Sequence, residues 1–221
     1  MGGYDPRMLI VADFDGTITE VEPLTFLAER FAPKLFTTWE DQLHSGEASL
    51  RDVFVSGFDE VTVSAAELIG TAVREVPIRA GFRELIDHAR AQGDRLVVLS
   101  AGFRQIIEPM LANGGVGDVE LIANELVVDA SGMHASFREL PTCAVCGEPC
   151  KRGDIERLRA EGAPGEHVVL IGDGYSDRCA AEIVDTVFAR DPLCGYLDDS
   201  GVPYVRYDDL APVVAHLRAN G

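Results

Sequence analysis

Basic residues are scarce in this sequence of 221 residues: 19 Lys and Arg stand against 37 Asp and Glu, and the formal net charge is −18. Proteins that bind nucleic acid normally present a basic face to the phosphates. We therefore expect no nucleic-acid partner. A small anionic ligand remains compatible with this charge if a bound metal and a few basic groups reverse the local field.

Long apolar runs are missing as well. No stretch reaches the roughly 18 residues that a membrane-spanning helix requires, and the apolar segment 8–12 follows no signal-peptide n-region. The sequence therefore predicts a cytoplasmic protein without a membrane partner. No pattern in the sequence indicates the oligomeric state.

The sequence has five cysteines, an odd number, and the chain is too long for a small secreted scaffold, so a disulfide framework is not expected. Cys143, Cys146 and Cys150 nevertheless lie close together, and Cys-x2-Cys is the spacing of a zinc knuckle. A closed Zn²⁺ site needs four ligands, and His134 is a candidate for the fourth. Thiols without a metal, or a disulfide between two of them, are the alternatives. We expect Cys179 in the core.

Continuous apolar segments predict the strands of a sheet that is buried on both faces. The clearest segments are residues 8–12, 95–100, 119–123 and 167–172, with weaker candidates at 184–189 and 202–205. Segments with helical periodicity lie between them, at residues 82–92, 103–112, 154–160 and 177–183. Strands that alternate with helices indicate an α/β fold with a doubly wound parallel sheet.

One long segment interrupts this alternation between the first and second strands. It carries helical patterns at residues 23–31, 36–44, 50–58 and 65–73. We interpret residues 18–78 as a small helical cap domain, and residues 1–17 and 79–221 as the α/β core domain. Insertions at the ligand-binding edge of such a sheet commonly cover the site and exclude water. Residues 127–137 predict a short antiparallel hairpin beside the main sheet.

Polar residues follow the predicted strands, at the edge where ligands bind in parallel α/β sheets. The candidate site residues at these strand ends are Asp13, Asp15, Ser100, Ala101, Gly102, Asp173, Ser176 and Asp177, and Lys151 joins them because it opens the helix that leads into the strand at 167–172. Each one alone is compatible with an ordinary turn, helix cap or surface position. Their joint occurrence around consecutive strand ends indicates one site.

The residue types in this group suit phosphoryl chemistry. Converging carboxylates repel one another, and Mg²⁺ relieves this repulsion with oxygen ligands while sharing its site with water and phosphate. The cation also screens an anionic nucleophile from an anionic phosphoryl group. Ser100 and the amides at its helix N-terminus can bind phosphate oxygens, and Lys151 offsets the negative charge that develops. The expected partner is a small phosphorylated metabolite.

These residues resemble the motifs of the haloacid dehalogenase (HAD) superfamily of phosphatases. The matching segments are Asp-x-Asp-Gly-Thr at 13–17, Ser-x-Gly at 100–102, Lys151, and Gly-Asp-Gly-x-Ser-Asp at 172–177. The insert after the first motif is similar to the cap of the phosphoserine phosphatase-like subgroup. The resemblance implies a HAD-like, Rossmannoid core and a phosphomonoester hydrolase that works through an aspartyl-phosphate. It also implies that Ser176 contacts the phosphate.

The resemblance further implies a role for each charged residue. Asp13 attacks phosphorus, and Asp15 protonates the leaving oxygen and then activates water. The Asp13 carboxylate, the Asp15 carbonyl and Asp173 hold Mg²⁺. Asp177 either supports the metal through water or orients Lys151.

The motifs constrain the substrate less tightly. Glu22 falls where phosphoserine phosphatases carry a Glu that holds the substrate amine. The cap arginine that those enzymes use for the substrate carboxylate has no counterpart near Gly57, where Arg51 is the closest basic residue, and Phe54 or Phe58 are expected to line the cap pocket instead. Cys143, Cys146 and Cys150 precede Lys151, which matches the third motif of the superfamily. This arrangement resembles relatives that act on 2-hydroxy-3-keto-5-methylthiopentenyl-1-phosphate, or on phosphocholine and phosphoethanolamine, and that often carry a cysteine just before this lysine.

Two other classes of function are compatible with the same fold. A phosphotransferase or mutase would pass the phosphoryl group to a second substrate. A non-catalytic, metal-stabilised binding domain would retain only the scaffold. The pair Asp13 and Asp15 argues against the last, because a binding module needs neither a nucleophile nor an acid.

Overall fold

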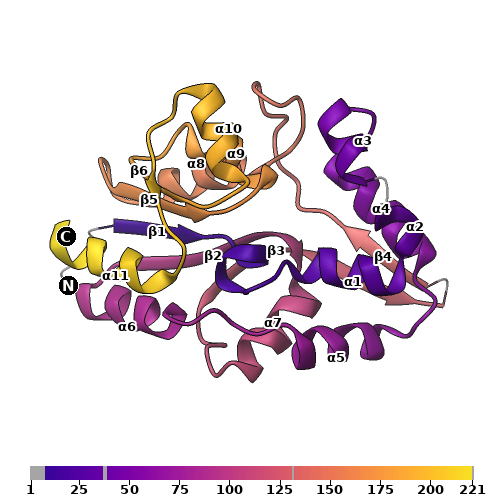
Figure 1. Ribbon diagram of the computed structural model, residues 1–221. Helices are drawn as coiled ribbons and strands as arrows, with labels where there is room; N and C mark the ends of the chain where they lie inside the picture. The colour runs from indigo at the N-terminus through magenta and orange to yellow at the C-terminus, as the bar shows by residue number, and fades with distance from the viewer. Residues whose placement is uncertain (1–7, 37–38, 131, 221) are drawn as a thin grey trace.

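The computed structural model describes residues 8–36, 39–130 and 132–220. Within these residues the chain forms a seven-stranded sheet in the order β4-β3-β2-β1-β5-β6-β7. Neighbouring strands pair in parallel, except for the antiparallel pair β3 and β4. Helices cover both faces of the sheet (Figure 1). The predicted doubly wound α/β class is therefore confirmed.

The elements have the following bounds. The strands are β1 (Met8–Ala12), β2 (Arg95–Phe103), β3 (Glu120–Asp129), β4 (Gly132–Ser136), β5 (His167–Gly172), β6 (Thr186–Ala189) and β7 (Val205–Arg206). The helices are α1 (Pro23–Phe31), α2 (Pro33–Phe36), α3 (Trp39–Ser45), α4 (Leu50–Glu60), α5 (Ala65–Glu75), α6 (Phe82–Gln92), α7 (Arg104–Asn113), α8 (Lys151–Glu161), α9 (Arg178–Ala181), α10 (Leu193–Ser200) and α11 (Leu210–Asn220). Across the described ranges, none of these helices is both long and apolar enough to cross a membrane.

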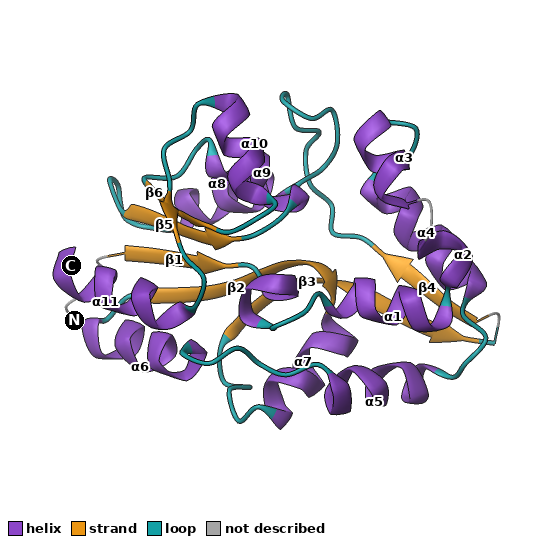
Figure 2. Cartoon of the chain, in the orientation of Figure 1, coloured by secondary structure: helices purple, strands orange, loops and turns teal. Residues whose placement is uncertain are grey.

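The central strand β1 explains why helices lie in two layers. Successive side chains of a strand point to opposite faces of the sheet. Leu9 and Val11 are buried in a cluster with α8, α9 and α10, whereas Ile10 and Ala12 are buried in a cluster with α6, α7 and α11. Figure 2 shows the sheet between these two helical layers. A continuous apolar run therefore fills both halves of the core.

Some predicted elements differ from the observed ones. The strand predicted at 119–123 is the first half of β3, which pairs with β2 as far as Asn124 and with β4 from Glu125 onward, as the expected hairpin. The helix predicted at 36–44 is divided between α2 and α3, and its residues 37–38 lie outside the described ranges. The sequence reasoning missed α10 and α11, in which Gly195 and Pro212 weaken the local helical signal.

Helices α1 to α5 occupy the predicted insert between β1 and α6. Its two ends meet, because Thr19 and Ile78 form an isolated antiparallel bridge and the Glu20 N–H donates to the Pro77 carbonyl over 3.1 Å. Helices α1 to α4 gather near the edge strand β4, which α4 contacts, whereas α5 lies beside α7 (Figure 1). Leu68 of α5 is buried in the same apolar cluster as the core helices. The division into cap and core domains stays a prediction.

Candidate active site

The sheet order brings the predicted site residues together. Strand β1 lies between β2 and β5 and is parallel to both, so the carboxyl ends of the three strands are neighbours. Asp13 directly follows β1, Ser100 lies near the end of β2, and Asp173 directly follows β5. The Asp13 N–H donates to the Ile171 carbonyl over 2.9 Å, which fixes the start of the first motif against β5.

Lys151 forms the positive centre of the site. Its Nζ lies 2.6 Å from Oδ1 of Asp13 and 2.7 Å from Oδ1 of Asp177, and all three side chains are buried. Burial disfavours the charged lysine, but the two carboxylates outweigh it and raise the pKa of Lys151. Asp177 Oδ2 accepts the N–H groups of Asp173 and Gly174, each over 3.2 Å. Both Asp177 oxygens are thus engaged, which favours orientation of Lys151 as its role.

Three buried carboxylates form a group that could hold a cation. Oxygens of Asp13, Asp173 and Asp177 lie within 4.8 Å of one another. Burial, followed by the charge of Asp177, raises the pKa of Asp13 well above its usual range and the pKa of Asp173 to about 7. Thr17 Oγ1 donates to Asp173 Oδ1 over 2.6 Å and holds that carboxylate in place. Clustered hard oxygens whose ionised forms are disfavoured fit a divalent ion such as Mg²⁺.

Asp15 lies beside this group and has a different environment. Ser100 Oγ donates to Asp15 Oδ2 over 2.9 Å, and the Gly102 N–H donates to Ser100 Oγ over 2.8 Å. Burial raises the pKa of Asp15 to about 6, although the hydrogen bond from Ser100 opposes the shift. A carboxyl group with a pKa near neutrality can both give and take a proton, as a general acid and base must. The Asp15 carbonyl as a metal ligand stays a prediction.

The segment Ser100-Ala101-Gly102 is not a helix N-terminus, which corrects the expectation from the sequence. Strand β2 continues to Phe103, and α7 begins only at Arg104. The pairing of β2 with β3 is irregular between Leu99 and Phe103, so the segment leaves the ladder locally. Its hydroxyl and amides are therefore presented by an irregular strand end that immediately precedes Phe103, the N-cap residue of α7.

Arginines that hold the backbone of the site were missed by the sequence reasoning. The Arg79 guanidinium donates to the carbonyls of Thr17, Gly16 and Thr19 over 2.8, 2.9 and 2.9 Å. Arg190 donates to the Gly16 carbonyl over 3.1 Å. Arg79 closely follows the predicted return of the insert at residue 77, which is the one signal that pointed to it.

Arg138 supports the second motif in the same way. Its guanidinium donates to the Ser100 carbonyl over 3.1 Å and lies 2.9 Å from the buried carboxylate of Asp154. Asn124 of β3 donates to the Ala101 carbonyl over 2.7 Å. The phosphate-binding segment expected at residues 100–102 is therefore anchored from β3, α8 and the loop after β4.

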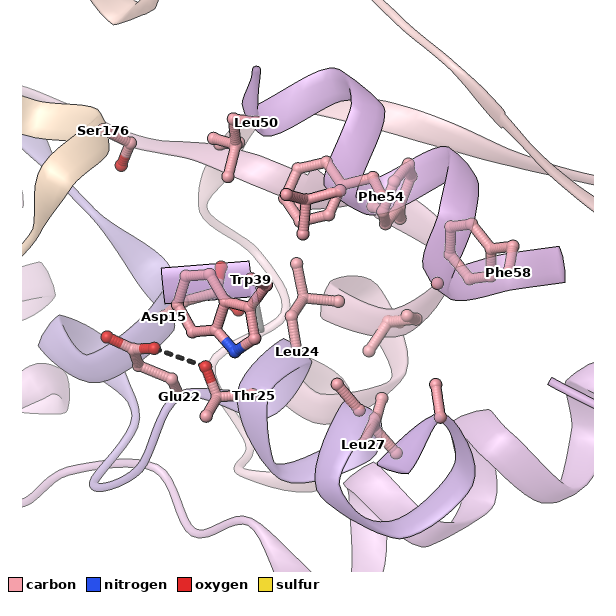
Figure 3. Close-up of a pocket in the computed structure, with 18 of the residues that line it drawn as sticks. Asp15, Glu22, Leu24, Thr25, Leu27, Trp39, Leu50, Phe54, Phe58 and Ser176 are labelled. Atoms are coloured by element: carbon pink, nitrogen blue, oxygen red, sulfur yellow. Dashed lines mark hydrogen bonds between the residues drawn. The ribbon is translucent and has the colours of Figure 1, made fainter. Parts of the chain in front are cut away.

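A cavity of about 170 Å³ opens between the helices of the predicted cap and the carboxyl groups of Asp13 and Asp15. Its wall includes Asp13, Asp15, Ala101, Gly102 and Ser176 from the core, and Glu22, Leu24, Trp39, Phe54 and Phe58 from the cap. Figure 3 shows the aromatic and leucine side chains around the cavity, with Glu22 and Thr25 near Asp15. Thr25 Oγ1 donates to Glu22 Oε2 over 2.6 Å. The expectation that Phe54 or Phe58 lines the cap pocket is confirmed.

The described lining of this cavity includes no Lys or Arg. Arg51 instead lines a neighbouring cavity, where its guanidinium lies 4.5 Å from the centre of the Phe137 ring and donates to the Arg138 carbonyl over 3.3 Å. Arg51 is therefore engaged with the loop after β4 and does not line the cap cavity.

The cysteine cluster differs from the prediction in its fourth member. The thiols of Cys143, Cys146, Cys150 and Cys179 lie within 4.8 Å of one another. His134 instead points to Asp129 of its own hairpin, with 3.4 Å between Nε2 and Oδ1. The structure therefore does not bring His134 into the group of cysteines, in which Cys179 is the fourth member. Cys179 is buried as expected, but within this cluster.

Comparison with known proteins identifies the family of the chain. The family model described as haloacid dehalogenase-like hydrolase matches residues 10–182. The chain belongs to the haloacid dehalogenase-like hydrolase family, as its motifs predict.

The chain is 30% identical over 211 residues to the bifunctional enzyme MtnB/MtnX of Bacillus licheniformis. This match covers 94% of this chain but 48% of that protein. It thus spans about half the length of that enzyme. It is 28% identical over 219 residues to a 2-hydroxy-3-keto-5-methylthiopentenyl-1-phosphate phosphatase of Brevibacillus brevis, with 96% of each chain covered. The crystal structure of phosphoserine phosphatase from T. onnurineus is similar in fold, with a TM-score of 0.71, 20% identity, and 98% and 96% of the two chains covered.

Proposed function

We propose that this protein is a magnesium-dependent phosphomonoester hydrolase that acts on a small metabolite with an apolar tail. The observation that carries the proposal is that Asp13 and Asp15 line an apolar cavity and that Asp13 pairs with the buried Lys151. The phosphatase class agrees with the names of the relatives. Among the candidate substrates we favour 2-hydroxy-3-keto-5-methylthiopentenyl-1-phosphate. A cytoplasmic location stays a prediction.

The reaction takes place in two steps at Asp13. Its carboxylate attacks phosphorus, the bond from phosphorus to the substrate oxygen breaks, and Asp15 protonates that oxygen as it leaves. Water then attacks the aspartyl-phosphate while Asp15 takes up its proton, which releases phosphate and restores Asp13. Lys151 offsets the negative charge that develops on the phosphoryl oxygens. Ser100 and the amides of the irregular strand end bind those oxygens.

The metal is assigned to the carboxylate group at the carboxyl ends of β1 and β5. Asp13, Asp173 and the Asp15 carbonyl would hold Mg²⁺, and Asp177 keeps Lys151 in place. When bound, the ion screens the repulsion between the Asp13 carboxylate and the phosphate.

The cavity wall favours an apolar tail over the head group of phosphoserine. A substrate carboxylate placed in this cavity would be desolvated without a basic partner from the described lining, which is costly. A thioether suits the same place, because sulfur makes favourable contacts with aromatic rings such as those of Phe54 and Phe58.

A cationic head group is the second candidate. Glu22 and Trp39 line the same cavity (Figure 3), and a carboxylate together with an aromatic face recognises ammonium groups. Phosphocholine or phosphoethanolamine would then place its amine between these side chains. The two candidates differ in their dependence on Glu22.

Phosphate release from a panel of phosphomonoesters tests both candidates. The panel contains the methylthiopentenyl phosphate, phosphoserine, phosphocholine, phosphoethanolamine and sugar phosphates, each with Mg²⁺ and with EDTA. We expect the highest kcat/KM for the methylthiopentenyl phosphate, and no release with EDTA or from Asp13→Asn. Asp199→Asn, on the exposed side of α10, is the matched control and should keep full activity.

The variant Glu22→Gln separates the two substrate classes. It should leave kcat/KM for the methylthiopentenyl phosphate within a few fold, whereas a preference for the choline or ethanolamine esters would be lost. Absence of metal-dependent release on the whole panel contradicts the hydrolase, and release only with an added acceptor indicates a phosphotransferase or mutase.

A further inference from the structure

We infer that Cys143, Cys146, Cys150 and Cys179 form a tetrathiolate zinc site that joins the segment before Lys151 to the segment after Asp177. The thiols come from two parts of the chain: three from the loop that precedes α8 and one from α9. The site is separate from the carboxylate group proposed for Mg²⁺, with which it shares no residue.

The geometry of the four sulfurs suits zinc. Structural zinc sites are tetrahedral with Zn–S bonds of about 2.3 Å, which places the sulfurs about 3.8 Å apart. The four sulfurs lie within 4.8 Å of one another, which is compatible with four thiolates around one zinc ion. Cys143 and Cys179 are buried and Cys146 and Cys150 are half-buried. Four soft ligands with little access to water select zinc over the hard cations.

The loop around Cys143 and Cys146 has the shape of a metal-binding knuckle. The Val145 N–H donates to Cys143 Sγ over 3.4 Å, and the Gly147 N–H donates to the Cys143 carbonyl over 2.9 Å. Gly147 has φ of +76°, a conformation that glycine adopts without strain, and this closes the turn. A backbone N–H directed at a sulfur stabilises a thiolate, the form that binds metal.

The position of the site in the chain explains why a cross-link is useful there. Residues 137–150 contain neither helix nor strand, and Val145 at the tip of the knuckle is 53% exposed. A loop of this length with little apolar burial needs another source of order. Cys194 offers a contrast, because it is buried among leucines of the second core cluster and lies outside the group of four thiols.

The site adjoins both partners of the buried ion pair. Cys150 directly precedes Lys151, and Cys179 follows Asp177 by two residues. Zinc would thus fix the two backbone segments whose side chains meet over 2.7 Å between Lys151 Nζ and Asp177 Oδ1. This positioning role rests on the proposed hydrolase function, whereas the zinc site itself does not.

Metal analysis of the 221-residue chain, purified without chelator after growth with added zinc, tests the site directly. We expect one equivalent of zinc per chain, released when a mercurial reagent modifies the thiols. Cys146→Ser and Cys179→Ser should lose the zinc, and the matched control Cys194→Ser should retain it. Zinc well below one equivalent in the native chain, or a mass deficit that shows disulfides among these cysteines, overturns the proposal.

Cobalt substitution keeps the test decisive if the serine variants do not fold. Protein produced with cobalt should show the intense charge-transfer and visible bands of tetrahedral cobalt thiolates, and Cys146→His should retain a tetrahedral spectrum with weaker charge transfer. Absence of these bands from a folded, cobalt-loaded chain contradicts the four-sulfur site.

Kinetics then separate the positioning role from the metal site. In the zinc-depleted enzyme we expect kcat to fall at least tenfold with little change in KM. The Cys146→His variant, loaded with zinc, should retain most of the native kcat. An unchanged kcat in zinc-free enzyme removes the positioning role and leaves the metal site. If no phosphomonoester is hydrolysed at all, the hydrolase proposal fails, while the zinc content and cobalt spectrum still decide the site.

Discussion

Lys151 and Asp13 form a buried ion pair, with 2.6 Å between Nζ and Oδ1, at the place where the proposed nucleophile must act. Asp177 holds the lysine from the other side over 2.7 Å. Because both carboxylates favour the ammonium form, Lys151 stays charged while Asp13 reacts. In the proposed reaction, one side chain therefore orients the nucleophile and offsets charge on the phosphoryl group.

Replacement of the lysine should affect both catalysis and stability. Lys151→Met leaves two buried carboxylates without their partner, so we expect a loss of stability of about 3–5 kcal/mol and a decrease in kcat of at least about 10²-fold. Urea unfolding and phosphate release measure the two effects. Lys34→Met, at an exposed position of α2, is the control. A kcat within tenfold of the wild-type value would show that Lys151 does not take part in catalysis.

Substitution of Asp15 should depend on the leaving group. Asp15→Asn cannot protonate the departing oxygen, so alkyl phosphates should react at least about 10²-fold more slowly. p-Nitrophenyl phosphate needs no such proton, and should give a burst of one nitrophenolate per chain followed by slow turnover, because water activation is lost as well. Rapid-mixing absorbance measures the burst. Equal losses for both kinds of ester, without a burst, would contradict the role of Asp15.

The positions of the proposed site aspartates could be predicted because they depend on strand order alone. Asp13 and Asp173 follow apolar runs that read unambiguously as buried parallel strands, and the carboxyl ends of such strands meet at one edge. Ser100 was assigned to the correct strand end, but it was expected at a helix N-terminus and lies instead in an irregular extension of β2. That extension depends on the pairing of β2 with β3. No periodicity in a single sequence encodes that pairing.

The residues that the sequence reasoning missed act across long separations. Cys179 lies 29 positions after Cys150, and only the packing of α9 against the loop before α8 brings their sulfurs together. Glu22 was named from its position after the first motif, but Trp39 joins it in the cavity wall only through the packing of α1 and α3, which their helical patterns alone do not specify. Local pattern thus predicts elements, whereas side-chain partners of this kind follow from tertiary contacts.

The carboxylate group predicts a pH dependence of the effect of magnesium. Burial and then the charge of Asp177 raise the pKa of Asp173 to about 7 from its ordinary value of 3.8, so the metal-free folded state binds more protons than the unfolded state between these values. Stability without metal therefore decreases as pH rises through this window. Mg²⁺ binds the ionised form, so it should raise Tm more at pH 8 than at pH 5.5.

The increase in Tm that Mg²⁺ causes should be larger at pH 8 than at pH 5.5 by at least about 2–4 °C, which corresponds to about 1 kcal/mol for a chain of this length. Thermal unfolding in Mg²⁺ and in EDTA at both pH values measures it, and Asp173→Asn should abolish it. A larger increment at the lower pH would refute the assignment of the ion to these carboxylates.

Arg79 provides the sharpest test of a residue that only the structure identifies. Its guanidinium binds the carbonyls of Gly16, Thr17 and Thr19, and so holds the turn that carries Asp15. Arg79→Met should lower stability by roughly 1–3 kcal/mol because these carbonyls lose their donor, and should weaken Mg²⁺ binding because the turn no longer holds the Asp15 carbonyl. Arg79→Lys should recover only part of the stability and part of the Mg²⁺ affinity, since an ammonium cannot reproduce the forked set of donors of the guanidinium.

Titration of Mg²⁺ against the intrinsic fluorescence or the Tm of each Arg79 variant measures the binding, and urea unfolding measures the stability. Arg83→Met, on the exposed face of α6, is the matched control and should change neither. A variant of Arg79 that is less stable but keeps the native affinity for Mg²⁺ and the native kcat would restrict this arginine to a structural role. Weakened binding together with a lower kcat at saturating Mg²⁺ is the expected result, because the same turn carries both the metal ligand and the general acid.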